Sequence, residues 1–173
     1  MFDTSYNYNK VNKIKSNDGV LLETLIYRFK SKNNLTYLVN IEKYKYDVYI
    51  LKFHLKNHTD SNNKYSLIVH HAKDSYDFDV SVILNTCVEI LLEIKNENEN
   101  ASFGFKGSPD FDGVINNTRR YRVYKLLTEN KFSTRYFEHR VSSKDSTYFL
   151  LNKNKDVEKL FLDINKMFIE YYN

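Results

Sequence analysis

The sequence predicts an α+β fold, in which a curved antiparallel β-meander (ββββα) is followed by β-α-β-β-α, with helices packed on one face of the sheet. Two observations lead to this prediction. Residues 20–71 form β-rich segments separated by short polar breaks, and residues 46–56 alternate apolar and polar as a half-buried antiparallel strand does. From residue 80, and again near the C-terminus, apolar residues instead follow the spacing of an amphipathic helix.

Four strands joined by short polar turns are expected over residues 20–30, 35–44, 46–56 and 64–71. The third strand shows the alternation most clearly. Tyr49, Leu51 and Phe53 share one face there, while Lys52 and His54 share the other. Consecutive strands with short connections form an antiparallel meander.

A helix is expected over residues 79–95, with Asp79 as its N-cap. The apolar residues that follow this cap recur at helical spacing: Val80, Ile83, Leu84, Cys87, Val88 and Leu91. We expect this helix to cover the apolar face of the meander.

The second half is expected to form a strand over 101–107, a loop over 108–113, a helix over 118–128, a hairpin of 132–141 with 146–153, and a helix over 156–172. Thr118 is the expected N-cap of the first of these helices. The last helix should pack on the same sheet face as the helix 79–95, which leaves Tyr and Phe residues of the outer face partly exposed. Residues 1–19 are expected to be a polar lead-in, and residues 20–173 a single domain.

The composition is that of a globular protein with a mild positive charge. Lys and Arg number 26 and Asp and Glu 22, which gives a net charge of +4 and supports nucleic-acid binding only weakly. The single Cys87 excludes a disulfide framework and a multi-cysteine metal site, and it fits a reducing compartment. No signal peptide or membrane-spanning run is visible, so a cytoplasmic location is expected.

Basic and aromatic side chains interleave through residues 101–140. This combination suits a polyanion with stackable faces, which means nucleic acid or a nucleotide. Phosphate contacts are expected from Arg119, Arg120, Arg122 and Lys125, and base stacking from Phe103, Phe105, Tyr121 and Tyr124. The remaining candidates for the nucleic-acid-binding surface are Lys106, Arg135, His139 and Arg140.

Gly104 stands between two phenylalanines in the segment 102–108. Glycine allows close approach of a ligand, and the Phe-Gly-Phe arrangement can present two rings on one sheet face. Gly104 can equally mark a bulge or tight packing. The segment lacks the lysine-serine ending of a P-loop and the spacing of a dinucleotide-binding fingerprint.

His139 is the one candidate for acid–base chemistry. On the expected strand it shares a face with Arg135 and Phe137, while Glu138 and Arg140 lie on the other. A histidine can act as a general base and an arginine can hold a phosphate. No second histidine is placed nearby by the sequence, so a salt bridge or a phosphate contact is favoured over catalysis.

No metal or cofactor is expected. His70 and His71 are adjacent, so on a strand their side chains point to opposite faces and do not converge on one ion. Cys87 lies on the apolar stripe of its helix and is expected in the core.

Two resemblances add to these expectations. The segments Ala101–Phe105, Asn117–Tyr124 and Phe137–His139 resemble a family of small uncharacterised bacterial proteins associated with Bacteroidetes-like genomes, which implies no catalytic residues. The order of four meandering strands and a helix is similar to one repeat of the PUR-alpha and Whirly groups. That likeness implies binding of single-stranded nucleic acid by a curved sheet, although the second half departs from the repeat through its inserted helix.

The leading hypothesis is therefore a non-enzymatic protein that binds single-stranded DNA or RNA through a basic-aromatic surface. The alternative is a protein-interaction module, such as a defence-system accessory or a phage-encoded inhibitor, that binds no nucleic acid. A metal-independent nuclease that uses His139 is the weakest hypothesis. The sheet edges and the C-terminal helix are the surfaces considered for a homodimer, and no membrane partner is expected.

Overall fold

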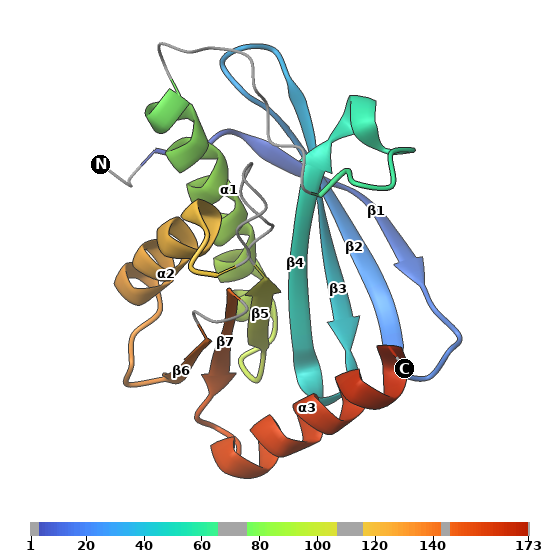
Figure 1. Ribbon diagram of the computed structural model, residues 1–173. Helices are drawn as coiled ribbons and strands as arrows, with labels where there is room; N and C mark the ends of the chain where they lie inside the picture. The colour runs from blue at the N-terminus through green and yellow to red at the C-terminus, as the bar shows by residue number, and fades with distance from the viewer. Residues whose placement is uncertain (1–3, 66–75, 107–115, 143–145, 173) are drawn as a thin grey trace.

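The computed structural model describes residues 4–65, 76–106, 116–142 and 146–172, and it shows an α+β protein built on one seven-stranded sheet (Figure 1). The strands lie in the order β1-β2-β3-β4-β5-β7-β6. The elements are β1 (Tyr8–Lys15), β2 (Leu21–Lys30), β3 (Thr36–Tyr44), η1 (Lys45–Asp47), β4 (Val48–Leu55), η2 (Lys56–His58), α1 (Tyr76–Glu97), β5 (Ser102–Lys106), α2 (Arg119–Lys131), β6 (Phe137–Ser142), β7 (Thr147–Asn152) and α3 (Val157–Tyr172).

The predicted order of strands and helices is confirmed, but its first strand is a different one. Residues 8–15, which the sequence assigns to the polar lead-in, form β1 and pair antiparallel with β2. As an edge strand, β1 is exposed along nearly all of its length, so it has no need of the apolar alternation that marks a buried strand. Of the strand predicted over 64–71, Lys64 and Tyr65 form a turn, and 66–71 lie outside the described residues, as does the predicted loop 108–113.

Strands β1 to β4 form the antiparallel meander, and β5 joins β4 in parallel after α1. The predicted hairpin is confirmed as the antiparallel pair β6–β7. The predicted cap of α2 is confirmed as well, because the Thr118 side chain accepts a hydrogen bond from the backbone N–H of Tyr121 at 3.3 Å. No helix among the described residues is long and apolar enough to cross a membrane.

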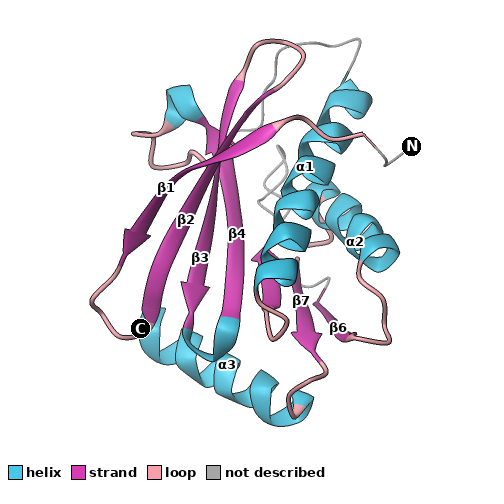
Figure 2. Cartoon of the chain, turned by 180° about the vertical axis from the view of Figure 1, so that it is seen from behind, coloured by secondary structure: helices cyan, strands magenta, loops and turns pink. Residues whose placement is uncertain are grey.

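Helices α1 and α2 pack together on one face of the sheet (Figure 2). The core there is built from alternate residues of the strands, such as Tyr27, Val39 and Phe53, together with Cys87 on the buried side of α1. Helix α1 begins at Tyr76, three residues before the predicted cap Asp79. The placement of that start from sequence was wrong because an aspartate is common in the first turn of a helix as well as at its cap.

Helix α3 packs on the opposite face, so the prediction that the helices share one face is wrong. Its buried residues Leu160, Ile164 and Met167 meet Tyr44, Val48 and Leu151, which point away from α1 and α2. Strand β7 shows the cause, because Phe149 and Leu151 are apolar on one face while Tyr148 and Leu150 are apolar on the other. Strands with two apolar faces require cover on both sides.

Gly104 allows the two halves of the sheet to pack closely on the α3 side. A Cβ atom at this position would lie 2.6 Å from a ring carbon of Phe149 and 2.7 Å from the Cδ1 atom of Ile50. Real Cβ atoms do not approach other atoms so closely. Of the two roles that the sequence leaves open for Gly104, the structure supports tight packing.

We expect Gly104→Ala to lower the free energy of unfolding by about 1–3 kcal/mol, because the added methyl group overpacks this contact. Urea denaturation measures the loss. The double variant Gly104→Ala/Phe149→Leu should recover part of the lost stability, since leucine removes the ring carbons. The single variant Phe149→Leu completes the double-mutant cycle. An unchanged stability of Gly104→Ala would contradict the packing role.

Candidate nucleic-acid interface

The four aromatic residues predicted to stack on bases lie in the protein core. Phe103, Phe105, Tyr121 and Tyr124 are only 0%, 3%, 2% and 2% exposed. The Phe105 ring centroid is 4.3 Å from that of Tyr124 and 5.0 Å from that of Tyr148, and Tyr121 also packs on Tyr148. Phe103 packs against Phe132 and Phe137. Their predicted stacking role is wrong, because the rings have no face open to a ligand.

The cations of α2 remain at the surface but have partners close by. Arg122 donates to the backbone carbonyl of Asn117, and the Lys125 Nζ atom lies 3.9 Å from Glu129. The side chains of Arg119 and Arg120 lie outside the described part of the structure. Lys106 is exposed at the end of β5.

Arg135 and Arg140 do not join the α2 cations in one site. Arg135 is exposed and lies over the ring of Tyr136, with 5.4 Å from its guanidinium carbon to the centroid. Arg140 points to the α3 side of the sheet, where it pairs with Glu138 and Glu158 and covers the ring of Phe161. A phosphate there would compete with two carboxylates. The structure therefore divides the predicted surface between opposite faces of the sheet.

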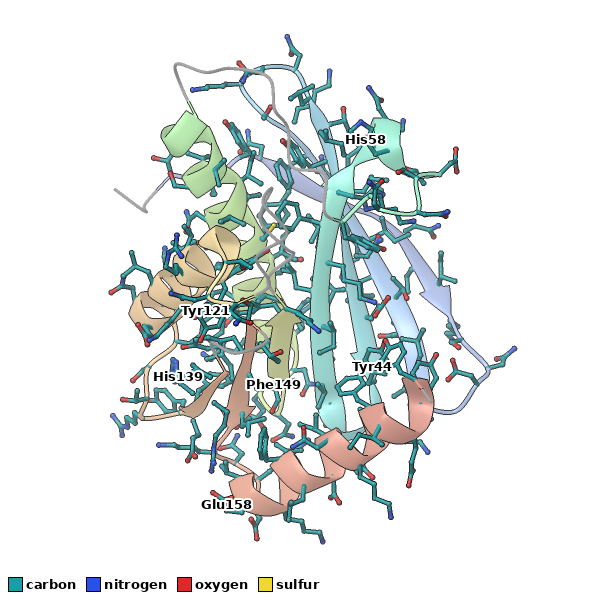
Figure 3. All side chains as sticks on the ribbon, viewed as in Figure 1. Tyr44, His58, Tyr121, His139, Phe149 and Glu158 are labelled. Carbon is teal, nitrogen blue, oxygen red and sulfur yellow. The ribbon has the colours of Figure 1, made fainter. Side chains whose placement is uncertain are left out.

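His139 is held by internal partners on both ring nitrogens. Its Nε2 lies 2.9 Å from the carbonyl oxygen of Phe132, which only accepts, so Nε2 carries the proton and Nδ1 accepts from the Tyr148 hydroxyl at 2.6 Å. Burial lowers the pKa of His139. The neutral ring ties β6 to β7 and to the end of α2, and it leaves no free lone pair for a substrate. Figure 3 shows His139 beside α2, far from Tyr44 near α3.

A second surface, which the sequence-based reasoning missed, lies on the face of β1–β4 that points away from α1 and α2. We call it the open sheet face. Strand register places its residues in rows across β2, β3 and β4: Arg28–Leu38–His54, Ile26–Asn40–Lys52 and Thr24–Glu42–Ile50. In Figure 1, α3 lies at the lower ends of these strands and η2 lies at the upper end of β4.

Positive charge predominates on the open sheet face. Strand register places Arg28, Lys30 and Lys52 on its upper part. Lys64 lies beside it, over the ring of Tyr65, whose hydroxyl accepts from Asn40, and Lys56 follows directly after β4 in η2. The carboxylates nearby in the strands and the segment 56–65 are Glu42 and Asp60. Lys52 pairs with Glu42 at 2.7 Å, whereas Arg28, Lys30 and Lys56 make no ion pair with a described residue.

Two tyrosines stand at the ends of this face, and their hydroxyl groups have partners. The Tyr65 ring packs edge-on against His54, with the Lys64 ammonium 5.4 Å from its centroid. Tyr172 is 63% exposed, and one face of its ring stacks on Phe168. Its hydroxyl lies 2.8 Å from that of Tyr44, which donates to Glu42 at 2.8 Å. These contacts fix the ring of Tyr172 while most of it faces solvent.

A signal for this surface was present in the sequence. The alternation in β4 already separates Lys52 and His54 from the core residues, and the same alternation in β2 places Arg28 and Lys30 on that side. Tyr172 had no such signal, since its position depends on which face α3 covers.

The structure offers no evident metal centre among the residues it describes, because no three His, Cys, Asp or Glu side chains come together there. His70 and His71 lie outside these residues. No family model matches the chain, and no curated protein or solved structure gives a significant match. The two resemblances seen in the sequence therefore stay predictions.

We expect the free energy of unfolding to fall as the pH is lowered from about 8 to about 5. Burial lowers the pKa values of His54 and His139 below 6.5, so the unfolded chain binds protons more readily, and stability is lost as the pH falls from that value through the folded-state pKa. Urea denaturation across this range should show that the free energy of unfolding depends less on pH in His139→Gln than in the wild type. The dependence should be weakest in His54→Gln/His139→Gln. An unaltered pH dependence in the double variant would refute this origin.

Proposed function

We propose that this protein is a non-enzymatic nucleic-acid-binding protein, and that its ligand is a single strand of DNA or RNA lying on the open sheet face. The observation that carries the proposal is the excess of cations there, together with the exposed ring of Tyr172. Cations bind the phosphates of any sequence, and an aromatic face stacks on any base.

The dimensions of the face suit a short single strand. Strand β3 runs nine residues from Thr36 to Tyr44, which is roughly 30 Å at the rise of an extended chain. The unpaired cations lie at one end of this distance, near Lys30, and Tyr172 lies at the other. A duplex keeps its bases stacked inside, so it cannot use the tyrosine rings, and single strands should bind more tightly.

The open sheet face is a better candidate than the outer surface of α2. Each described cation of α2 already has a partner. Lys131, for example, pairs with Glu89 at 2.8 Å. Arg28 and Lys30 have none among the described residues. A phosphate therefore replaces only water around Arg28, whereas at Lys131 it must displace a carboxylate.

A protein-interaction module is the second candidate, and the outer surface of α3 favours it. Leu162 and Ile169 lie two turns apart on the solvent side and are 67% and 62% exposed. Exposed apolar side chains on one helix stripe are typical of a surface that meets another protein. Absence of nucleic-acid binding would favour this second candidate.

We expect the protein to bind labelled single-stranded DNA or RNA with micromolar or lower Kd in fluorescence anisotropy, more tightly than duplex DNA. Arg28→Gln/Lys30→Gln should weaken binding and reduce the slope of log K against log salt by about 1.4, since each phosphate contact on a single strand contributes about 0.7. The matched control Arg122→Gln/Lys125→Gln removes two cations from α2 and should bind nearly as the wild type does.

Three results would count against this assignment. If neither single-stranded DNA, single-stranded RNA nor duplex DNA binds at low salt, the proposal of nucleic-acid binding is wrong. Equal losses in the two double variants would show only a general effect of charge. A loss confined to the α2 variant would return the site to the α2 surface.

We expect Tyr172→Ala to weaken binding of single strands by about 1–3 kcal/mol, the contribution of one stacked base. Tyr172→Phe keeps the ring and removes only the hydroxyl contact with Tyr44, so its affinity should stay near that of the wild type. Circular dichroism melting separates a loss of binding from a loss of α3 packing. Equal affinities of the alanine and phenylalanine variants would show that no base stacks there.

A further inference from the structure

A cavity of about 340 Å³ lies on the other face of the sheet, where β1–β3 meet the end of α1. Lys10, Lys13 and Lys43 line it together with Glu23 and Glu97, and the Tyr49 side chain contributes to its wall. It is thus separate from the open sheet face, where the function proposed above is placed. Its volume is at the lower end of the range for small-molecule sites.

The charges around this cavity do not cancel. Lys13 pairs with Glu23 at 2.8 Å, and Lys10 lies 3.6 Å from the exposed Glu97. Lys43 pairs with no carboxylate of the described residues. Lys43, from β3, and Lys15, which is outside the cavity lining, flank Glu23 in the strand register.

Three ammonium groups therefore line the cavity against two carboxylates, and the carboxylate of Asp47, which accepts a hydrogen bond from the Asn98 amide, is already paired with Lys155. The negative end of the α1 dipole, at Glu97, offsets only roughly half a charge. The region keeps a positive excess, which favours an anion.

Tyr49 supplies an independent indication of a ligand. Its side chain is only 4% exposed, and its hydroxyl oxygen accepts a hydrogen bond from the Asn98 amide at 3.1 Å. The hydroxyl proton itself has no acceptor among the described residues. Because Tyr49 lines the cavity, this proton can be donated to an oxygen of a bound ligand.

We propose that this cavity binds a phosphomonoester dianion, the terminal phosphate of a molecule about the size of a nucleoside monophosphate. Lys43 and Lys10 bind the phosphate oxygens as point charges, and the Tyr49 hydroxyl donates a hydrogen bond to one of them. Glu97 is exposed and is free to turn toward solvent when Lys10 changes partner. The phosphate is carried either by a free small molecule or by the end of a nucleic acid.

Isothermal titration calorimetry with 5′-AMP and with adenosine tests this site. We expect AMP to bind and adenosine, which lacks the phosphate, to bind at least about tenfold more weakly, the loss of one charge-assisted hydrogen bond. Lys43→Gln and Tyr49→Phe should each weaken AMP binding, the former by about tenfold. Lys45→Gln removes an exposed lysine two positions further along the chain, outside the cavity, and should leave AMP binding unchanged.

Absence of AMP binding, equal affinity for AMP and adenosine, or an equal loss in Lys43→Gln and Lys45→Gln would each overturn the proposal. Oligonucleotides with a 5′-phosphate and with a 5′-hydroxyl, compared once AMP binding is established, identify the source. A preference for the 5′-phosphate that Lys43→Gln abolishes assigns the cavity to strand ends. No preference assigns it to a free small molecule.

Discussion

The two-sided burial of the strands at the lower end of the sheet determines the rest of the architecture. Val48 and Leu151 are fully buried on one face, while their neighbours Tyr49 and Leu150 are buried on the other. Water must be excluded from both faces, so α1 and α2 cover one and α3 covers the other. Helix α3 is too short to cover the whole second face, and the upper part of β2–β4 carries mostly polar side chains with Ile26 and Leu38 among them.

The boundary between the covered and the uncovered part of that face is a chain of polar contacts. Lys52 binds Glu42, Glu42 accepts from Tyr44, and Tyr44 meets the hydroxyl of Tyr172. Burial lowers the pKa of Lys52, but the hydrogen bond and charge of Glu42 outweigh it and raise that pKa overall. Lys52 therefore stays charged, and the contacts position the last turn of α3 at the edge of the open sheet face.

Sequence patterns predicted local structure well and surface exposure poorly. Alternation and helical spacing suffice for the order of elements and for the Thr118 cap, because these depend on neighbouring residues. Which side of an element is covered depends on distant segments. Tyr121 and Tyr124 illustrate this. Their spacing of three residues fits a helix face turned toward the core, but the neighbouring arginines led to the prediction that both tyrosines lie at a surface site. The edge strand β1 was not predicted because it buries few side chains, and its sequence therefore lacks the apolar alternation that marks a buried strand.

Alternation in β3 also explains how one thin sheet can hold the two sites proposed above. Glu42 points to the open sheet face, and the next residue, Lys43, points into the cavity beside α1. Successive side chains of a strand lie on opposite faces, so a substitution at either residue leaves the other side chain in place. The two sites share a backbone but no side chain. A ligand on one face can influence the other by shifting the strands that both faces share, and the antiparallel pairing on both sides of β3 resists such a shift.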